Sequence, residues 1–162
     1  WALGFVHVQS RRFEMAIDSL RKALELDRSY ADAYALMGGI YTYIGQPANA
    51  IPLVRTAMRL NPDGGYLYFQ ILGRAYLFED DVEQALINLR EASVRNPVDL
   101  ETRVYLAAAM EAAGDRFGAE WEAEEIRALD AGFSMRKWFE TYPMTSTAHK
   151  ERLRGLLAKA GL

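Results

Sequence analysis

The chain of 162 residues contains no cysteine, which excludes a disulfide framework, thiolate metal sites and cysteine nucleophiles. Its two histidines, His7 and His149, have no second histidine at the spacing of a metal site. No apolar run approaches the roughly 18 residues that a membrane-spanning helix needs. The glycines are scattered singly and form no phosphate-binding loop. We therefore expect a protein that is not an enzyme, holds no cofactor or metal and does not insert into a membrane. We also expect it to be cytoplasmic, although the absence of cysteine does not indicate a compartment.

Basic side chains are scarce in residues 65–133, and acidic side chains are scarce in the tail that follows. Residues 65–133 carry six basic and fourteen acidic side chains, whereas residues 134–162 carry six basic and two acidic ones. One interpretation is that the basic tail docks on the acidic residues before it. The other is that the two segments form independently solvated faces.

The chain also begins at Trp1 in the middle of a helical pattern, so we expect it to be a fragment of a longer protein.

Small residues recur along the chain at fixed intervals. In the clearest copy, steps of twelve, seven and five residues lead from Gly38 to Ala50, Ala57 and Pro62. The copies are offset by 34, 35 and 34 residues. The corresponding residues of the other copies are Gly4, Ala16 and Ala23; Gly73, Ala85, Ala92 and Pro97; and, in a weaker fourth copy, Ala107, Ala119 and Ile126.

This pattern resembles the tetratricopeptide repeat family, whose period is about 34 residues. The resemblance covers residues 1–133 and implies an all-α fold, a right-handed superhelix of stacked helical hairpins (an α-solenoid). Its four repeats would be 1–30 (truncated at its N-terminus), 31–65, 66–99 and 100–133 (degenerate), followed by a helical cap over 134–162. The expected helices are 1–9, 13–26, 30–43, 47–60, 65–78, 81–95, 98–113 and 115–130.

The recurring small residues have a physical reason. A single hairpin cannot bury its own apolar stripe, so neighbouring repeats stack to complete the core. Where two helix backbones cross closely, a larger side chain would cause overpacking strain. The expected packing positions are Gly4, Ala16, Ala23, Gly38, Ala50, Ala57, Gly73, Ala85 and Ala92.

Residues 134–162 do not repeat the pattern. A short amphipathic helix is expected after Ser134, and Ser146 or Thr147 would cap a second helix over about 147–160. We expect Trp138, Leu153 and Leu157 to cover the apolar edge of the fourth repeat. The tail resembles the ending of bacterial proteins in which such repeats follow a class III adenylate/guanylate cyclase domain. The matching residues are Phe133, Ser134, Trp138, Tyr142, Pro143, Glu151, Arg152, Leu153 and the segment 155–162.

In the family that the repeats resemble, the first helix of each hairpin lines a concave groove. Aromatic and arginine side chains in a recess are the usual anchors of binding energy. Family members that hold a peptide carboxylate use polar clamp residues, but Leu36, Leu67 and Ile71 stand at such positions here and cannot donate hydrogen bonds. An alternative is that Leu36 and Ile71 simply pack between helices. The candidate groove residues are Phe5, Gln9, Tyr43, Gln70, Arg74, Phe78 and Tyr105.

Three functions follow from this interpretation. The first is a scaffold that binds a protein or peptide partner in the groove, as a non-catalytic module of a larger bacterial signalling protein such as a nucleotide cyclase. The second is self-association into a homo-oligomer, because a truncated first hairpin would leave Trp1 and Phe5 uncovered. The third, nucleic-acid binding, requires a basic groove, whereas Arg74 is the one inward cation that the pattern places. We therefore expect no nucleic-acid partner.

Overall fold

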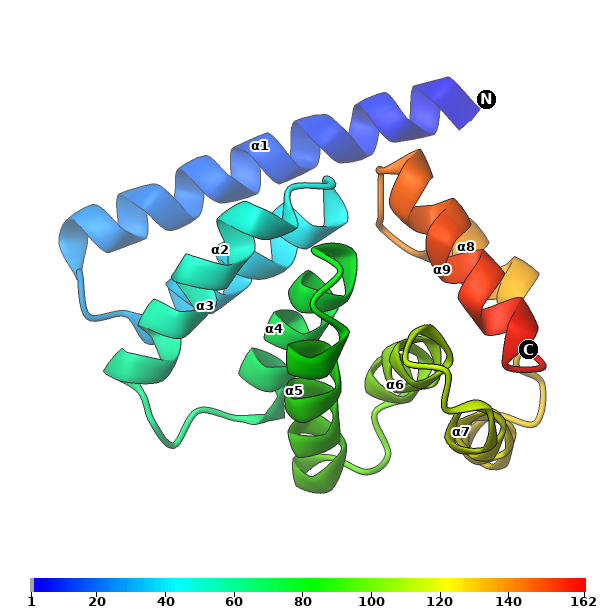
Figure 1. The fold of residues 1–162 in the computed structure, drawn as a ribbon. Helices are drawn as coiled ribbons and strands as arrows, with labels where there is room; N and C mark the ends of the chain where they lie inside the picture. Colours follow the sequence, from blue (N-terminus) through cyan, green and yellow to red (C-terminus); the bar gives the residue numbers. More distant parts are fainter. Residues whose placement is uncertain (1) are drawn as a thin grey trace.

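The computed structural model describes the backbone of residues 2–162 and the side chains of residues 12–162, and this part of the chain is helical without strands (Figure 1). The all-α solenoid expected from the sequence is confirmed. Its described helices are α1 (Ala2–Leu26), α2 (Ala31–Tyr43), α3 (Pro47–Leu60), α4 (Tyr66–Phe78), α5 (Val82–Arg95), α6 (Leu100–Ala112), α7 (Arg116–Leu129), α8 (Met135–Thr141) and α9 (Thr147–Lys159).

Three helical hairpins, α2–α3, α4–α5 and α6–α7, stack in chain order. Each turns at one residue in the left-handed region: Gly45 (φ 82°), Asp80 (φ 64°) and Gly114 (φ 81°). The N–H of the following residue donates to the carbonyl five residues back, at 2.8, 3.0 and 2.9 Å respectively, which satisfies the helix end. In the last two hairpins that following residue is an aspartate, Asp81 or Asp115, whose carboxylate caps the next helix.

The first repeat does not form the expected hairpin. Residues 1–9 and 13–26 were expected as two helices, but α1 runs without a break from Ala2 to Leu26. By the repeat register, Arg11 stands where the other repeats have their left-handed residue, and Arg12 stands where two of them have a capping aspartate. An arginine disfavours the left-handed region and cannot accept a capping hydrogen bond. The helix therefore continues through the position of the turn.

The recurring small residues lie where helices cross. A Cβ atom on Gly38 would be 2.5 Å from Val54 Cγ2, and one on Gly73 would be 2.6 Å from Leu89 Cγ. Ala50, Ala57, Ala85 and Ala92 are fully buried. In α1, by contrast, Ala16 and Ala23 are only partly buried. Since α1 has no hairpin partner, the stripe that these two residues form stays uncovered on one side. The surroundings of Gly4 lie outside the described side chains.

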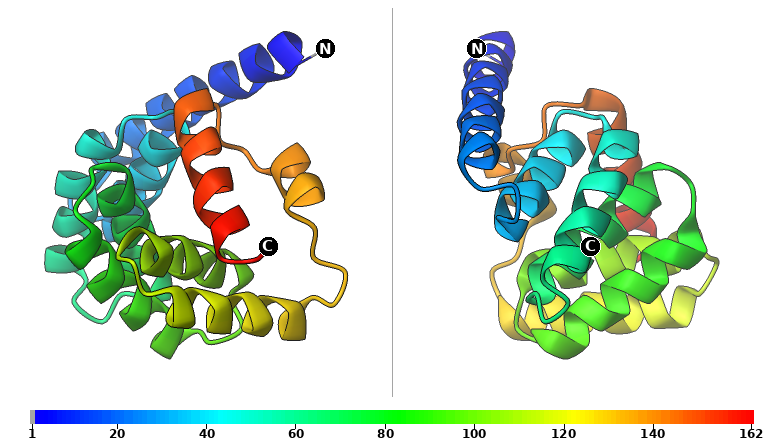
Figure 2. Two further views of the ribbon diagram at one scale, coloured as in Figure 1. Left: turned by 45° about the vertical axis from the view of Figure 1, so that its right-hand side comes forward. Right: turned by 90° about the vertical axis from the view of Figure 1, so that its left-hand side faces the viewer.

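The C-terminal tail crosses the concave side of the stacked hairpins (Figure 2). Helix α9 packs against α6 and buries Leu153 and Leu157 completely. Between α8 and α9, the backbone N–H of Thr145 donates to the carbonyl of Tyr43 at 2.8 Å. Trp138 stacks on Tyr142 at a centroid distance of 3.9 Å. The tail therefore reaches the second repeat as well as the fourth.

Ion pairs do not dock the tail on the acidic fourth repeat, contrary to the expectation. Arg103 pairs with Glu122 at 2.8 Å and with Glu125 at 3.3 Å, so an arginine of the repeat itself neutralises those carboxylates. Among the described contacts, the tail pairs with the repeats through Arg152, which lies 2.5 Å from Asp80 of the third repeat. Apolar burial, more than charge, therefore holds the tail in place.

Candidate functional site

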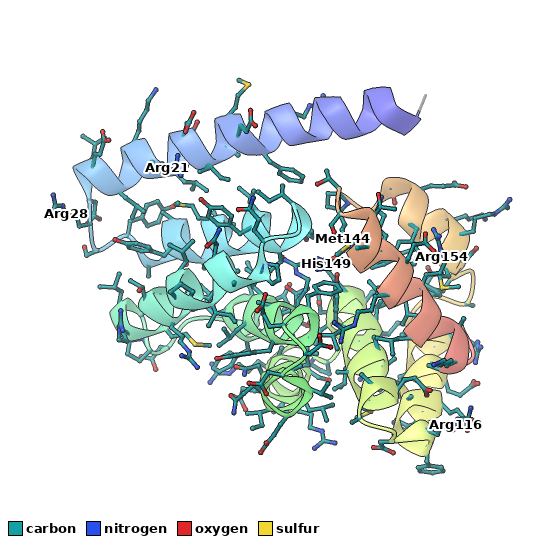
Figure 3. All side chains as sticks on the ribbon, turned by 45° about the horizontal axis from the view of Figure 1, so that its top comes forward. Arg21, Arg28, Arg116, Met144, His149 and Arg154 are labelled. Carbon is teal, nitrogen blue, oxygen red and sulfur yellow. The ribbon has the colours of Figure 1, made fainter. Side chains whose placement is uncertain are left out.

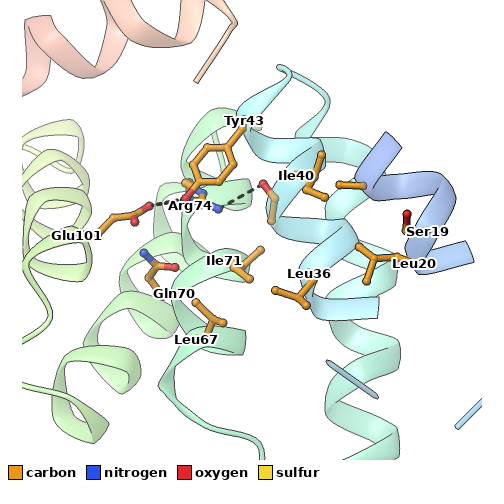
Figure 4. A pocket seen from close by; sticks show the side chains of 12 residues that line it. Ser19, Leu20, Leu36, Ile40, Tyr43, Leu67, Gln70, Ile71, Arg74 and Glu101 are labelled. Carbon is orange, nitrogen blue, oxygen red and sulfur yellow. Dashed lines mark hydrogen bonds and ion pairs between the residues drawn. The ribbon is translucent and has the colours of Figure 1, made fainter. Parts of the chain in front are cut away.

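A pocket of about 450 Å³ opens on the concave side, between α1, α2 and α4 (Figure 4). It lies beyond the part of the groove that the tail crosses, and one residue of α6 closes its far end. The lining residues are Ala16, Ser19 and Leu20 of α1; Leu36, Gly39, Ile40 and Tyr43 of α2; Leu67, Gln70, Ile71 and Arg74 of α4; and Glu101 of α6.

Most of the pocket wall is aliphatic. Leu36 and Leu67 keep 44% and 38% of their surface exposed, which is unusual for leucines that face the inside of a fold. Gly39 also lines the pocket, and a Cβ atom there would approach Ile71 Cδ1 to 3.3 Å. The glycine thus deepens the pocket. An apolar recess of this kind binds apolar side chains by removing them and its own wall from water.

A buried arginine forms the polar end of the pocket. Arg74 is 1% exposed and makes an ion pair with Glu101. Its Nη1 also donates to the Tyr142 hydroxyl at 3.1 Å, and its Nη2 donates to the Gly39 carbonyl at 3.4 Å. The Tyr43 ring covers the guanidinium at 4.1 Å from its carbon. Burial opposes the charge, but the potential of Tyr142, Tyr43 and Glu101 raises the pKa of Arg74 above its usual value.

Two tyrosine hydroxyls continue this cluster under the tail. The Tyr142 hydroxyl donates to Glu101 Oε1 at 2.5 Å and lies 3.0 Å from the Tyr105 hydroxyl. Burial raises the pKa of both tyrosines, so both hydroxyls stay protonated. Arg74 Nε has no hydrogen-bond partner among the described residues, but the bonds of Nη1 and of the two hydroxyls link these side chains into one network, and such a network fixes its members. The network therefore holds the tail, through Tyr142, against the inner helices.

The tail covers part of the predicted groove. His149 stacks on Phe78 with ring centroids 4.3 Å apart and an interplanar angle of 7°. Met144, which is 1% exposed, also points into the space between the tail and the repeats, whereas Arg28 and Arg116 lie at the edges of the molecule (Figure 3). The expectation that Phe78 lines an open groove is therefore wrong.

The structure divides the candidate groove residues into three groups. Tyr43, Gln70 and Arg74 line the pocket. Phe78 and Tyr105, at 6% and 0% exposure, lie beneath the tail, because α9 and the segment before it bury them. The side chains of Phe5 and Gln9 lie outside the described residues.

Sequence reasoning missed the contribution of α1 and of Ile40 to the pocket. Ala16, Ser19 and Leu20 line it because α1 is a single helix without a hairpin partner. In a closed first hairpin these residues would face that partner. The signal that could have found them was the pair of arginines at the expected turn, Arg11 and Arg12.

The histidine, aspartate and glutamate side chains of the described residues form no group of three that could hold a metal ion. None of their helices is both long enough and apolar enough to cross a membrane. The concave pocket is therefore the strongest candidate for a binding site in this part of the chain.

Comparison with known proteins agrees with the repeat pattern. A tetratricopeptide repeat family model matches residues 1–30 and 31–63. The crystal structure of MamA is 22% identical, with a TM-score of 0.67 over 91% of this chain and 86% of that chain. YrrB, described as a TPR protein with an unusual peptide-binding site, is 23% identical, with a TM-score of 0.64 over 98% of this chain and 82% of that chain.

A third similar structure is TTC0263 of Thermus thermophilus, described as a thermophilic TPR protein. It is 16% identical, with a TM-score of 0.65 over 99% of this chain and 90% of that chain. No curated protein matches the chain. At these identities the solved structures establish the solenoid fold, and the family match establishes that residues 1–63 have the sequence of two repeats.

Proposed function

Because the chain contains tetratricopeptide repeats, we propose that it is a non-catalytic scaffold that holds an apolar peptide or helix of a partner protein in the concave pocket. The observation that carries this proposal is the pocket wall, where Leu36 and Leu67 stay exposed beside a fixed polar cluster. Apolar side chains of a partner would fill the recess, and the polar end would orient the segment. The description of YrrB as peptide-binding is consistent with this use of the fold.

The charge of the pocket favours a neutral, apolar segment. The cation among its described lining residues, Arg74, is buried and already paired with Glu101, so it has no free charge for a carboxylate or a phosphate. The aliphatic wall offers no other donor at the positions where a carboxylate clamp would need one. A C-terminal carboxylate and a nucleic-acid backbone are therefore poor ligands for this pocket.

The setting in a larger protein belongs to the same proposal. The tail resembles the ending of cyclase-linked repeat regions, and on that ground we propose a cytoplasmic signalling protein, such as a nucleotide cyclase, as the parent. This context rests on the residues of the tail. The coding sequence upstream of Trp1 tests it, since the context requires a cyclase or other signalling domain there.

A peptide selection tests the pocket. A random library displayed on phage would be selected against the whole chain, and the enriched peptides would be measured by fluorescence polarisation. We expect peptides with apolar residues at helical spacing, because an amphipathic helix laid in a groove presents that pattern. Leu36→Glu should weaken their binding at least tenfold, because it places a charge in the apolar wall.

The matched control is Ile87→Glu on α5, the second helix of the third repeat. Leu36 and Ile87 are similarly exposed, at 44% and 54%, so neither substitution should unfold the chain. Circular dichroism would verify that both variants stay helical. Equal peptide binding by the two variants would contradict the proposal. Selection of acidic peptides whose binding Leu36→Glu does not weaken would also contradict it.

A further inference from the structure

The first repeat has the sequence of a hairpin but the structure of one helix. The family model matches residues 1–30 as one repeat and residues 31–63 as the next. In the structure these residues form the long α1, which continues through Arg11 at the position of the hairpin turn. The inner helix of this repeat is therefore opened out, and its place beside the second repeat is vacant.

The exposed fraction of Leu36 on α2 shows that the covering inner helix is missing. In the next repeat the residue in register with Leu36 is buried, since Ile71 is 3% exposed. Ile71 packs against the inner helix before it, because a Cβ atom on Gly39 would lie 3.3 Å from its Cδ1. Leu36, with 44% exposed, lacks the corresponding helix. By register, the missing neighbour at that contact is Phe5.

The C-terminal half of α1 also lacks an inner helix to cover it. Ala50, Ala85 and Ala119, which are in register with Ala16, are all fully buried by the inner helix of their own hairpin. Ala16 is only partly buried and lines the pocket together with Leu20. The pocket therefore lies between the two surfaces that an inner helix of the first repeat would cover.

We propose that residues 2–9 of a second copy of this chain fill the pocket, so that two chains exchange the N-terminal halves of their α1 helices. This inference rests on the proposed function, because it names the occupant of the same pocket. The segment has the right chemistry for it. Its sequence, ALGFVHVQ, is uncharged at pH 7 if His7 is neutral and places Phe5 in register to meet Leu36.

The repeat register also fixes the geometry of the exchange. Gly38 meets Ala50 and Val54, which are twelve and sixteen residues further on. In the exchange Gly4 of one chain would therefore meet Ala16 and Leu20 of the other. The two α1 helices would run antiparallel, with their two-fold axis beside residues 10–12. Such a contact uses the same patch on both chains and closes as a dimer.

The continuous helix makes a second copy the fitting occupant. Within one chain, residues 2–9 can reach the pocket only if α1 breaks at Arg11, and this residue disfavours the left-handed turn found in the other repeats. In an exchanged dimer no turn is needed. A hairpin element that opens at a disfavoured turn and pairs with another copy is the general route to domain swapping.

Sedimentation velocity over a range of concentrations tests the exchange. We expect the wild-type chain to form a dimer, and we expect Arg11→Gly/Arg12→Asp to be monomeric. This variant restores the turn glycine and capping aspartate that stand together at Gly114 and Asp115, so the first repeat can close on itself. The matched control, Arg11→Ala/Arg12→Ala, removes the same two cations but favours the helix, and it should remain dimeric. A monomeric wild type, or a dimer that survives the turn-restoring variant, would overturn the exchange.

Engineered cysteines give the same answer by a second method, since the native chain has no cysteine to react. Oxidation of Phe5→Cys/Leu36→Cys should give a disulfide-linked dimer, whereas Phe5→Cys/Val94→Cys, with Val94 78% exposed, should not. A disulfide within one chain would overturn the exchange.

If the chain is monomeric but binds selected peptides through Leu36, the exchange fails and the proposed function stands. If it is dimeric and Leu36→Glu leaves both the dimer and peptide binding unchanged, both fail.

Discussion

Two glycines inside helices, Gly73 and Gly155, have opposite surroundings. Helix propensity alone favours alanine over glycine by about 1 kcal/mol at both positions. A Cβ atom on Gly73, however, would lie 2.6 Å from Leu89 Cγ and 3.1 Å from the Ala85 carbonyl oxygen. Around Gly155, in the exposed part of α9, no atom apart from its chain neighbours and the nearby backbone of its own helix lies within 4 Å of such a Cβ. Substitution of each glycine by alanine therefore distinguishes the effect of close helix packing on stability from the effect of helix propensity.

We expect Gly73→Ala to lower the free energy of unfolding by about 1–3 kcal/mol, because overpacking outweighs the gain in propensity. Gly155→Ala should raise it by about 0.5–1 kcal/mol. Urea denaturation followed by circular dichroism measures both. If Gly73→Ala also stabilises the chain, the close crossing of α4 and α5 is not what selects glycine there.

The buried arginine shows what residue patterns leave open. Arg74 was a candidate groove residue because the repeat register turns it inward, and the structure does place it on the pocket. Its partners, Glu101 and Tyr142, come from the fourth repeat and the tail. These contacts join residues that are far apart in sequence. A pattern with a period of 34 residues carries no information about the tail, so the neutralised charge of Arg74 could not be predicted.

At the scale of the element, docking of the tail depends on pH through His149. His149 stacks on Phe78, and its Nδ1 has no hydrogen-bond partner among the described residues. Burial, and then the nearby Arg152, lower the pKa of His149, while Glu79 opposes this shift. The folded tail thus favours the neutral imidazole. Below the unfolded pKa of 6.5 the unfolded tail binds the proton first, so the stability of docking falls as the pH falls.

We expect the midpoint of thermal unfolding to drop between about pH 7.5 and about pH 5.5, the range in which histidine titrates. His149→Phe keeps the stacked ring but cannot titrate, so it should show a smaller drop. His7 is present in both chains, and the comparison therefore isolates His149. An equal drop in the two proteins would show that protonation of His149 does not control docking of the tail.

Helix boundaries could be predicted from the sequence where the turn chemistry was explicit. Gly45 and Pro47 end one helix and begin the next, and the structure has its turn and the start of α3 there. The break expected around residues 10–12 was inferred from periodicity alone. Arg11 and Arg12 supply neither the left-handed residue nor the cap that a turn needs. Periodicity therefore predicted the repeat, but local chemistry decided whether its hairpin closes.

For the whole molecule, the number and stacking of the hairpins after the first repeat could be predicted, but the shape of the binding surface could not. The open first repeat and the docked tail both act on the concave side. Together they leave an apolar pocket near the N-terminal end and bury Phe78 and Tyr105 of the predicted groove beneath the tail. Neither effect belongs to the repeat pattern, so each had to be read from the structure.

Methyl NMR of the whole chain tests the central claim, that the concave pocket is the binding site. Isoleucine and leucine methyl groups would be followed while a peptide from the selection is added. If the peptide binds in the pocket, the signals of Leu36, Ile40 and Leu67 should shift, and those of Ile87 and Leu129 on other faces should stay unchanged. Shifts confined to Ile87 and Leu129, with the pocket methyl groups unmoved, would contradict it.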